Sequence, residues 1–126
     1  GTLTGAARVA LGPELPPFYT DDEALAADIA ACAAAERDPL WRMPLYRPYD
    51  TLLDSKVADL GNVASGSFAG SIVCALFLKR FVEKAKAFAH FDIYAWTPAA
   101  KPARPEGGEC QAARALYALL KARYPA

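Results

Sequence analysis

The sequence predicts a layered α/β fold in which helices cover both faces of a sheet. Residues 88–96 form the clearest predicted strand, because both alternating sets of side chains are largely apolar, and such a strand is covered on both faces. Residues 21–36, 69–84 and 109–123 have the periodicity or composition of helices. At 126 residues, 54% of them hydrophobic, the chain has the size of one domain and can bury a core.

The first helix is predicted over residues 21–36. Thr20 and Glu23 fit a capping box, in which the hydroxyl accepts from the third amide and the glutamate reaches back to the cap amide. Alanines of high helix propensity continue the segment. The apolar positions that recur at helical spacing are Leu25, Ile29 and Cys32.

The middle of the chain is predicted to be extended before it becomes helical. Prolines break residues 41–50 and favour an extended connection. A short helix is expected at 50–55, followed by a strand or extended run at 56–63. Glycines between 66 and 70 predict a turn into the helix 69–84. Since this helix is apolar almost all round, we expect it to be buried on more than one side.

The last quarter of the chain consists of a loop and a helix. Residues 97–108 form a loop rich in proline and glycine, of a length often found in functional or interface loops. The final helix, 109–123, is expected to pack through the stripe Ala112, Leu116, Leu119 and Leu120.

Charge and hydropathy exclude several classes of partner. Lysine plus arginine equals aspartate plus glutamate, 14 against 14, so the sequence predicts binding neither to nucleic acid nor to an anionic membrane. The apolar run 72–78 is much shorter than the roughly 20 residues that span a bilayer. With no targeting pattern at its start, the chain is expected to be cytoplasmic.

The cysteines and the single histidine do not form a zinc-binding pattern. Cys32, Cys74 and Cys110 are widely separated, and no Cys-x-x-Cys pair occurs. Cys32 and Cys74 lie in apolar helical contexts, which favours a reduced structural thiol over a reactive one.

His90 and Asp92 share one face of the predicted strand. They are compatible with an acid-base or ligand pair, but a hydrogen-bonded structural pair is the favoured interpretation. Asp50, Asp54 and Asp59 have no histidine or cysteine beside them, so turn and cap roles are favoured over metal ligation.

Four segments together resemble the carboxy-terminal part of the cytosolic leucyl aminopeptidases. They occur in that family's order and approximate spacing, and they are Thr2-Leu3-Thr4-Gly5-Ala6, Asp38-Pro39-Leu40-Trp41-Arg42-Met43-Pro44-Leu45, Ala58-Asp59-Leu60 and Ala89-His90-Phe91-Asp92-Ile93. The resemblance implies a layered α/β/α fold with a mixed central sheet. It also implies that residues 1–126 are a single domain, an incomplete C-terminal portion of a larger catalytic domain whose upstream half is absent.

The resemblance further implies a metal-dependent aminopeptidase that uses two divalent ions, zinc or manganese, to activate water. The family's metal-binding lysine and acidic motif belong upstream of Thr2, so this chain alone is expected to bind no metal and to carry no catalytic residue. In the family, the Thr-Leu-Thr-Gly run binds the substrate backbone. Carried over, Thr2 and Leu3 lie in that run, with the Leu3 carbonyl accepting a hydrogen bond from the peptide and the Gly5 amide donating one.

The pocket for the first side chain of the peptide falls, by the same resemblance, at Tyr94 and Thr97. Many relatives have small residues where this chain has Tyr94-Ala95-Trp96, which predicts a reshaped pocket. The implied partners are a peptide substrate, the upstream part of the same catalytic domain and further copies in a homo-hexamer. The alternative is a catalytically inactive fragment that acts as a packing or assembly module.

Overall fold

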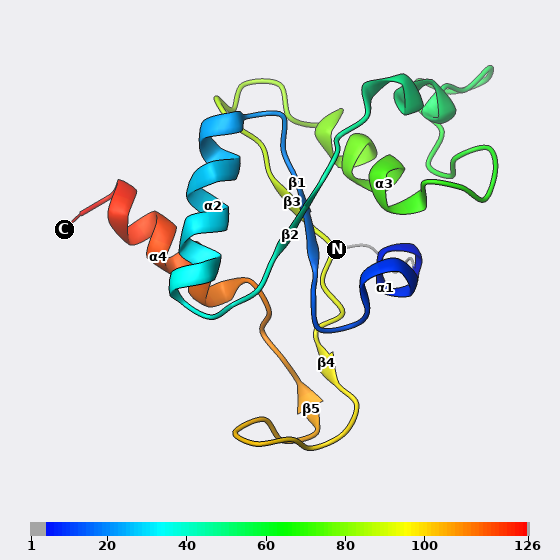
Figure 1. Cartoon of the computed structure of the whole chain (residues 1–126). Coiled ribbons are helices and arrows are strands. Elements are labelled where there is room, and N and C mark those ends of the chain that lie inside the picture. Colours follow the sequence, from blue (N-terminus) through cyan, green and yellow to red (C-terminus); the bar gives the residue numbers. More distant parts are fainter. Residues whose placement is uncertain (1–4, 126) are drawn as a thin grey trace.

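The computed structural model describes residues 5–125, which form a mixed α/β fold (Figure 1). The helices are α1 (Ala6–Leu11), α2 (Glu23–Ala35), α3 (Gly70–Lys79) and α4 (Ala113–Arg123), with a 3-10 helix η1 (Arg47–Leu53). The strands are β1 (Pro17–Tyr19), β2 (Trp41–Met43), β3 (His90–Phe91), β4 (Trp96–Thr97) and β5 (Gly107–Gly108). None of the helices in this part of the chain is long and apolar enough to cross a membrane.

The central sheet has the strand order β2-β1-β3 and is mixed, as expected. Strand β1 pairs with β2 in parallel, with Phe18 opposite Arg42, and with β3 antiparallel, with Phe18 opposite Phe91. Helices α2 and α4 lie on one side of this sheet, and α1 and α3 lie on the other (Figure 1). A separate antiparallel hairpin, β4–β5, extends away from the sheet. The layered α/β fold class is therefore confirmed.

One apolar core lies between the sheet and the α2/α4 pair. Its buried members are Phe18, Leu25, Ala26, Ile29 and Leu119. The Phe18 and Phe91 rings stack with their centroids 5.9 Å apart. A second, smaller core joins η1 to α3 through Leu53, Val73 and Leu76.

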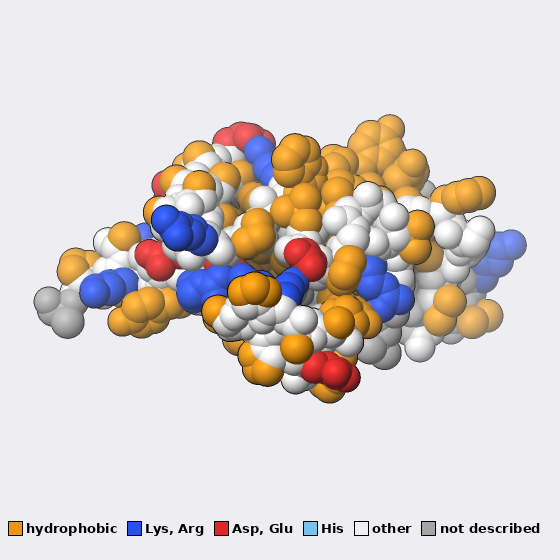
Figure 2. All heavy atoms as spheres, turned by 60° about the horizontal axis from the view of Figure 1, so that its bottom comes forward, with side chains coloured by type: hydrophobic (Ala, Val, Ile, Leu, Met, Phe, Trp, Pro, Cys, Tyr) orange, Lys and Arg blue, Asp and Glu red, His pale blue; other side chains and the backbone are white. Residues whose placement is uncertain are grey.

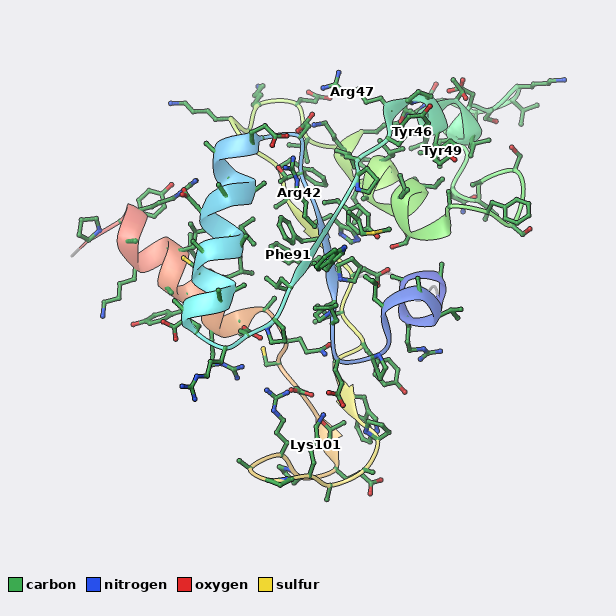
Figure 3. All side chains as sticks on the ribbon, in the orientation of Figure 1. Arg42, Tyr46, Arg47, Tyr49, Phe91 and Lys101 are labelled. Carbon is green, nitrogen blue, oxygen red and sulfur yellow. The ribbon has the colours of Figure 1, made fainter. Side chains whose placement is uncertain are left out.

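The predicted capping box at the start of α2 is wrong. The helix begins at Glu23, and its cap is Asp22, whose carboxylate accepts a hydrogen bond from the Leu25 amide at 2.9 Å. The Thr20 hydroxyl instead accepts from the Asp22 amide at 3.1 Å. Glu23 forms an ion pair with Arg42 of β2, which lies beside the start of α2 (Figure 3). The extended backbone of Asp22 suits a cap, so its carboxylate replaces the threonine in that role.

The predicted strand 88–96 is interrupted. Only β3 pairs with the sheet, and β4 belongs to the hairpin. Between them Ala95 adopts a left-handed conformation with φ 57°. Strand β3 already ends at Phe91, and a residue with positive φ cannot continue an extended ladder, so residues 88–96 do not form one strand.

Three other boundaries differ from the sequence prediction. Residues 56–63 form bends without strand pairing, and the Ser55 hydroxyl accepts from the amides of Val57 and Ala58. Helix α3 ends at Lys79, five residues before the predicted end, and the following residues 81–87 are exposed. Helix α4 begins at Ala113 and buries Ala115 and Leu119, whereas Leu120 is exposed.

Candidate functional site

The candidate site lies where the start of α1 approaches the segment between β3 and β4. Gly5 is the cap residue of α1. From the next turn, the Arg8 guanidinium lies over the Tyr94 ring, 4.7 Å from its centroid. A Cβ added to Gly5 would lie 3.5 Å from Nη2 of Arg8. Two predicted substrate contacts, Gly5 and Tyr94, therefore both lie next to Arg8. Thr2 and Leu3 lie outside the described residues.

Arg8 was not singled out in the sequence, because one arginine in a short amphipathic segment carries no signal. It forms no ion pair among residues 5–125. Its cation is held instead by the face of Tyr94, an interaction worth about 0.5–1 kcal/mol at exposed sites. Tyr94, which is 37% exposed, and Arg8, which has no ion pair among residues 5–125, give the candidate site an apolar surface with one positive charge.

Tyr94 and Thr97 differ in their environments. The Tyr94 residue is 37% exposed, so its ring is available at the surface. Thr97 is buried, and its hydroxyl donates to Oε2 of Glu109 at 2.8 Å. Glu109 also pairs with Arg104 across the hairpin. Thr97 is therefore anchored to the hairpin, while Tyr94 faces outward.

Gln111 connects the segment between β3 and β4 to the segment that follows α1, and the sequence analysis did not identify it. Its Oε1 accepts from the amides of Tyr94 and Ala95, each at 3.1 Å, and its Nε2 donates to the Pro13 carbonyl at 2.8 Å. A glutamine just before a helix has no distinctive local pattern, because all three partners are distant in sequence. Only the fold identifies it.

His90 and Asp92 lie together on the buried side of the sheet that faces α3. No hydrogen bond joins them, so the predicted hydrogen-bonded pair is wrong in detail. Ser71 of α3 donates to Oδ2 of Asp92 at 3.1 Å, and the Tyr19 hydroxyl bonds to the same Ser71 oxygen. The His90 ring stacks on Tyr19 at 5.8 Å, and its Nε2 has no hydrogen-bond partner among the described residues. Asp92 therefore bonds to α3 rather than to the histidine.

Burial shifts the titration of this polar group. It lowers the pKa of His90, which is partly countered by the nearby Asp92 carboxylate, and it raises the pKa of Tyr19. Burial likewise raises the pKa of the half-buried Cys74 thiol, which disfavours a reactive thiolate. The histidine does not contact the serine oxygen, so these side chains do not form a nucleophile with a general base.

The carboxylates considered as metal ligands have other partners. Arg80 donates to both carboxylate oxygens of Asp50 and to Asp54 Oδ1 at 3.0 Å. Asp59 is exposed. Within residues 5–125, no group of three or more histidine, cysteine, aspartate or glutamate side chains could hold a metal ion. The side chains described here do not fit a two-metal centre, and we assign them no step of metal chemistry.

Charged side chains of both signs lie around the hairpin (Figure 2). Figure 2 shows lysine and arginine side chains near acidic ones on the side of the molecule that carries β4–β5. A hollow there is lined by Arg37, Lys101 and Arg104, among others, and Lys101 lies in the hairpin loop (Figure 3). Lys101 pairs with Glu14 and Arg104 with Glu109. Because two of the cations are neutralised, this hollow is a weak candidate for an anion site.

Comparisons with known proteins identify the family. The family model described as "Cytosol aminopeptidase family, catalytic domain" matches residues 1–117. A probable cytosol aminopeptidase of Agrobacterium fabrum is 42% identical over 126 residues, covering 98% of this chain and 25% of the relative. The chain thus spans about a quarter of the length of this curated relative.

Two solved structures have the same fold over almost the whole chain. The cytosol aminopeptidase from Coxiella burnetii superposes with a TM-score of 0.89 at 47% identity, covering 98% of this chain and 27% of that protein. The bottromycin maturation enzyme BotP, solved in complex with Mn, gives a TM-score of 0.85 at 33% identity, covering 96% and 27%. The sequence match and the structural match cover the same residues, and the chain belongs to the cytosol aminopeptidase family as a portion of its catalytic domain.

Proposed function

We propose that the complete protein is a leucyl-aminopeptidase-like enzyme that releases amino-terminal residues from peptides, and that this chain forms one wall of its cleft. The observation that carries the proposal is the family match over residues 1–117, together with the meeting of Gly5 and Tyr94 at Arg8. Glycine at position 5 permits a close approach of a peptide backbone.

Each predicted contact has a distinct role in this proposal. The run of Thr2 and Leu3 binds the substrate backbone, with the Leu3 carbonyl as acceptor, and the Gly5 amide donates a hydrogen bond to it. Tyr94 and Thr97 contribute to the pocket for the first side chain. Thr97 belongs to the hairpin, and its hydroxyl bond to Glu109 supports a rigid pocket edge.

The ions and the assembly belong to the complete protein. Two divalent ions, zinc or manganese, supply the activated water when bound, and their ligands come from the upstream part of the catalytic domain. This agrees with the Mn complex of BotP, a relative in fold. The proposal includes a homo-hexamer in the cytoplasm, with neither nucleic acid nor membrane as a partner.

The pocket is tested with Tyr94→Ala and Trp96→Ala variants of the full-length protein. Because both residues add volume where many relatives are small, removing either side chain should favour bulky first residues. Rates on leucine, alanine and phenylalanine amides measure this, and the phenylalanine-to-alanine ratio of kcat/KM should rise by roughly 10-fold. Tyr117→Ala, on the exposed face of α4, is the control. Unchanged ratios in both variants would show that Tyr94 and Trp96 do not line the pocket.

A second candidate is a non-catalytic packing or assembly module. The observation in its favour is the set of large apolar side chains left exposed, such as Trp41, Phe68 and Tyr124, since exposed apolar surface often marks an interface. Intact mass and metal analysis of material purified from its native source separate the two. A chain of 13.5 kDa that is alone and metal-free supports the module, and a longer chain with two metal equivalents supports the enzyme.

A further inference from the structure

Gln111 is a buried side chain whose amide group is fully engaged by backbone partners. It is 8% exposed and precedes α4. Oε1 accepts two hydrogen bonds, from the amides of Tyr94 and Ala95, and Nε2 donates one to the Pro13 carbonyl. The two amide donors and the carbonyl acceptor around the Gln111 side chain therefore determine which way its amide group is oriented. In the opposite orientation its NH₂ group would face two amide donors and its oxygen would face a carbonyl.

The two amides that Gln111 binds belong to a turn that needs support. Ala95 is left-handed with φ 57°, a conformation that costs a non-glycine residue about 1 kcal/mol or more. On its far side, the Ala95 carbonyl accepts from the Glu109 amide at 3.0 Å. Gln111 and Glu109 together hold this turn, and the turn decides where the Tyr94 side chain leaves the backbone.

The third bond of Gln111 reaches the other part of the wall. Pro13 follows α1 directly after Gly12, which ends that helix with φ 76°. At its other end α1 carries Gly5 and, one turn later, Arg8, which lies over Tyr94. A single side chain thus links the segment that follows α1 to the turn that carries Tyr94.

We propose that Gln111 is a positioning residue that sets the width of the first side-chain pocket by holding the Tyr94 turn against the segment that follows α1. This inference rests on the proposed function. Gln111 does not touch the substrate in this account, and its effect on selectivity passes through Tyr94.

The test uses the full-length protein with two replacements that separate the acceptor function of the Gln111 amide from its donor function. Gln111→Met has a similar size and removes all three hydrogen bonds. Gln111→Glu keeps the acceptor for Tyr94 and Ala95, but as a carboxylate it cannot donate to Pro13. Protonation restores a donor, and burial raises the pKa of a carboxyl group toward the range of the assay.

The measurement is the phenylalanine-to-alanine ratio of kcat/KM on amino-acid amides from about pH 6 to pH 9. Gln111→Met should change the ratio by roughly 10-fold at every pH. Gln111→Glu should change it at high pH and return toward the wild-type ratio as the pH falls. The wild-type ratio should stay constant. Leu119→Ala is the matched control, because it loosens α4 from its core without contacting Tyr94, Ala95 or Pro13.

Two results would overturn the proposal while leaving the proposed function intact. One is a wild-type ratio in active Gln111→Met and Gln111→Glu enzymes. The other is an equal change in Leu119→Ala at matched thermal stability, which would show a general effect of loosening α4. If the wild-type protein hydrolyses no amide with zinc or manganese, the proposed function itself fails, and the selectivity role fails with it.

Discussion

The two faces of the central sheet are packed in different ways, although they share the same three strands. On the α2/α4 face, Phe18 and Phe91 stack and lie against an apolar core. On the α3 face, the adjacent residues Tyr19, His90 and Asp92 are buried with polar groups, and Tyr19 and Asp92 bond to Ser71 of α3. Alternation along each strand sends neighbouring residues to opposite faces.

The difference between the faces shows that the helices are held to the sheet in two ways. Apolar packing on the α2/α4 side depends on area and tolerates small shifts, whereas the polar side requires specific bonded pairs. Ser71 of α3 supplies the hydrogen bonds to Tyr19 and Asp92 of the sheet. The Arg80 ion pairs with Asp50 and Asp54 add to the small apolar core between η1 and α3. Disruption should therefore be most costly on the apolar face and most sensitive to pH or salt on the polar one.

The largest effect is expected from Phe18→Ala. Phe18 is 1% exposed at the centre of the apolar face, and such truncations cost about 3–5 kcal/mol. Tyr19→Phe, its neighbour on the polar face, removes only the hydroxyl bond to Ser71 and should cost about 1 kcal/mol. Urea unfolding of both variants measures the difference. Equal losses would show that the two faces do not differ in this way.

Asp38→Ala should have the next largest effect. The buried Asp38 carboxylate accepts from the amides of Ala112, Arg114 and Ala115, and so caps α4 from a distant part of the chain. Its loss leaves amide donors without an acceptor and should cost about 2–3 kcal/mol in the unfolding free energy.

The control for Asp38 is Asp28→Ala, which removes a surface ion pair between Asp28 of α2 and Arg123 of α4. Exposed pairs of this kind contribute little. A loss in Asp28→Ala as large as that in Asp38→Ala would contradict the importance of the buried cap.

A pH effect is expected at His90. Because burial lowers its pKa in the folded state below the ordinary value of 6.5, the unfolded chain binds more protons near and below that pH. Stability should therefore be fully present above pH 6.5 and should fall as the pH decreases from there toward the folded pKa. Asp21 and Glu23, whose pKa values are lowered by Lys79 and Arg42, lose their contributions at more acidic pH.

His90→Phe tests the histidine while keeping an aromatic ring against Tyr19. Between pH 7 and pH 5, the urea midpoint of the His90→Phe variant should decrease less than the urea midpoint of the wild-type protein. Parallel pH curves for the two proteins would assign the loss to other groups.

The smallest effects are expected at the partly exposed ion pairs of Arg80 with Asp50 and Asp54, which Arg80→Gln removes together. The guanidinium and its partners are partly exposed, so the loss of stability should be modest. It should also shrink in about 1 M salt, where the Debye length is roughly 3 Å. Asp54→Asn, at the more exposed partner, should give a still smaller loss. A loss that does not depend on salt would point to packing of the arginine stem.

Local sequence patterns predicted the main helices but not how each one is capped. Alanine propensity and apolar spacing located α2, and the apolar segment 72–78 located α3. The cap of α4 could not be predicted, because Asp38 lies 74 residues before Ala112, the first amide it binds. The predicted strand 88–96 is longer than the observed β3 for a similar reason. The turn at Ala95 is bonded to Gln111, which is distant in sequence.

The candidate site was predicted only in part. Resemblance indicated Gly5, Tyr94 and Thr97. The structure adds Arg8, which lies over Tyr94, and Gln111, which links Tyr94 to Pro13. Both additions are single residues of common types, and their importance comes from partners brought close by folding. The two-residue spacing of His90 and Asp92 placed them on one face, but their partners come from β1 and α3.

By itself, the sequence determined the class of fold, the approximate positions of α2, α3 and α4 and the family, because propensity, periodicity and ordered motifs are local properties of the chain. Only the tertiary structure decided which polar groups meet. Asp38 reaches α4, Gln111 reaches the turn at Ala95, and Ser71 reaches Asp92 across sequence separations that carry no local signal. Buried polar groups must find partners wherever the packed chain offers them, and the packing of the whole domain determines those positions.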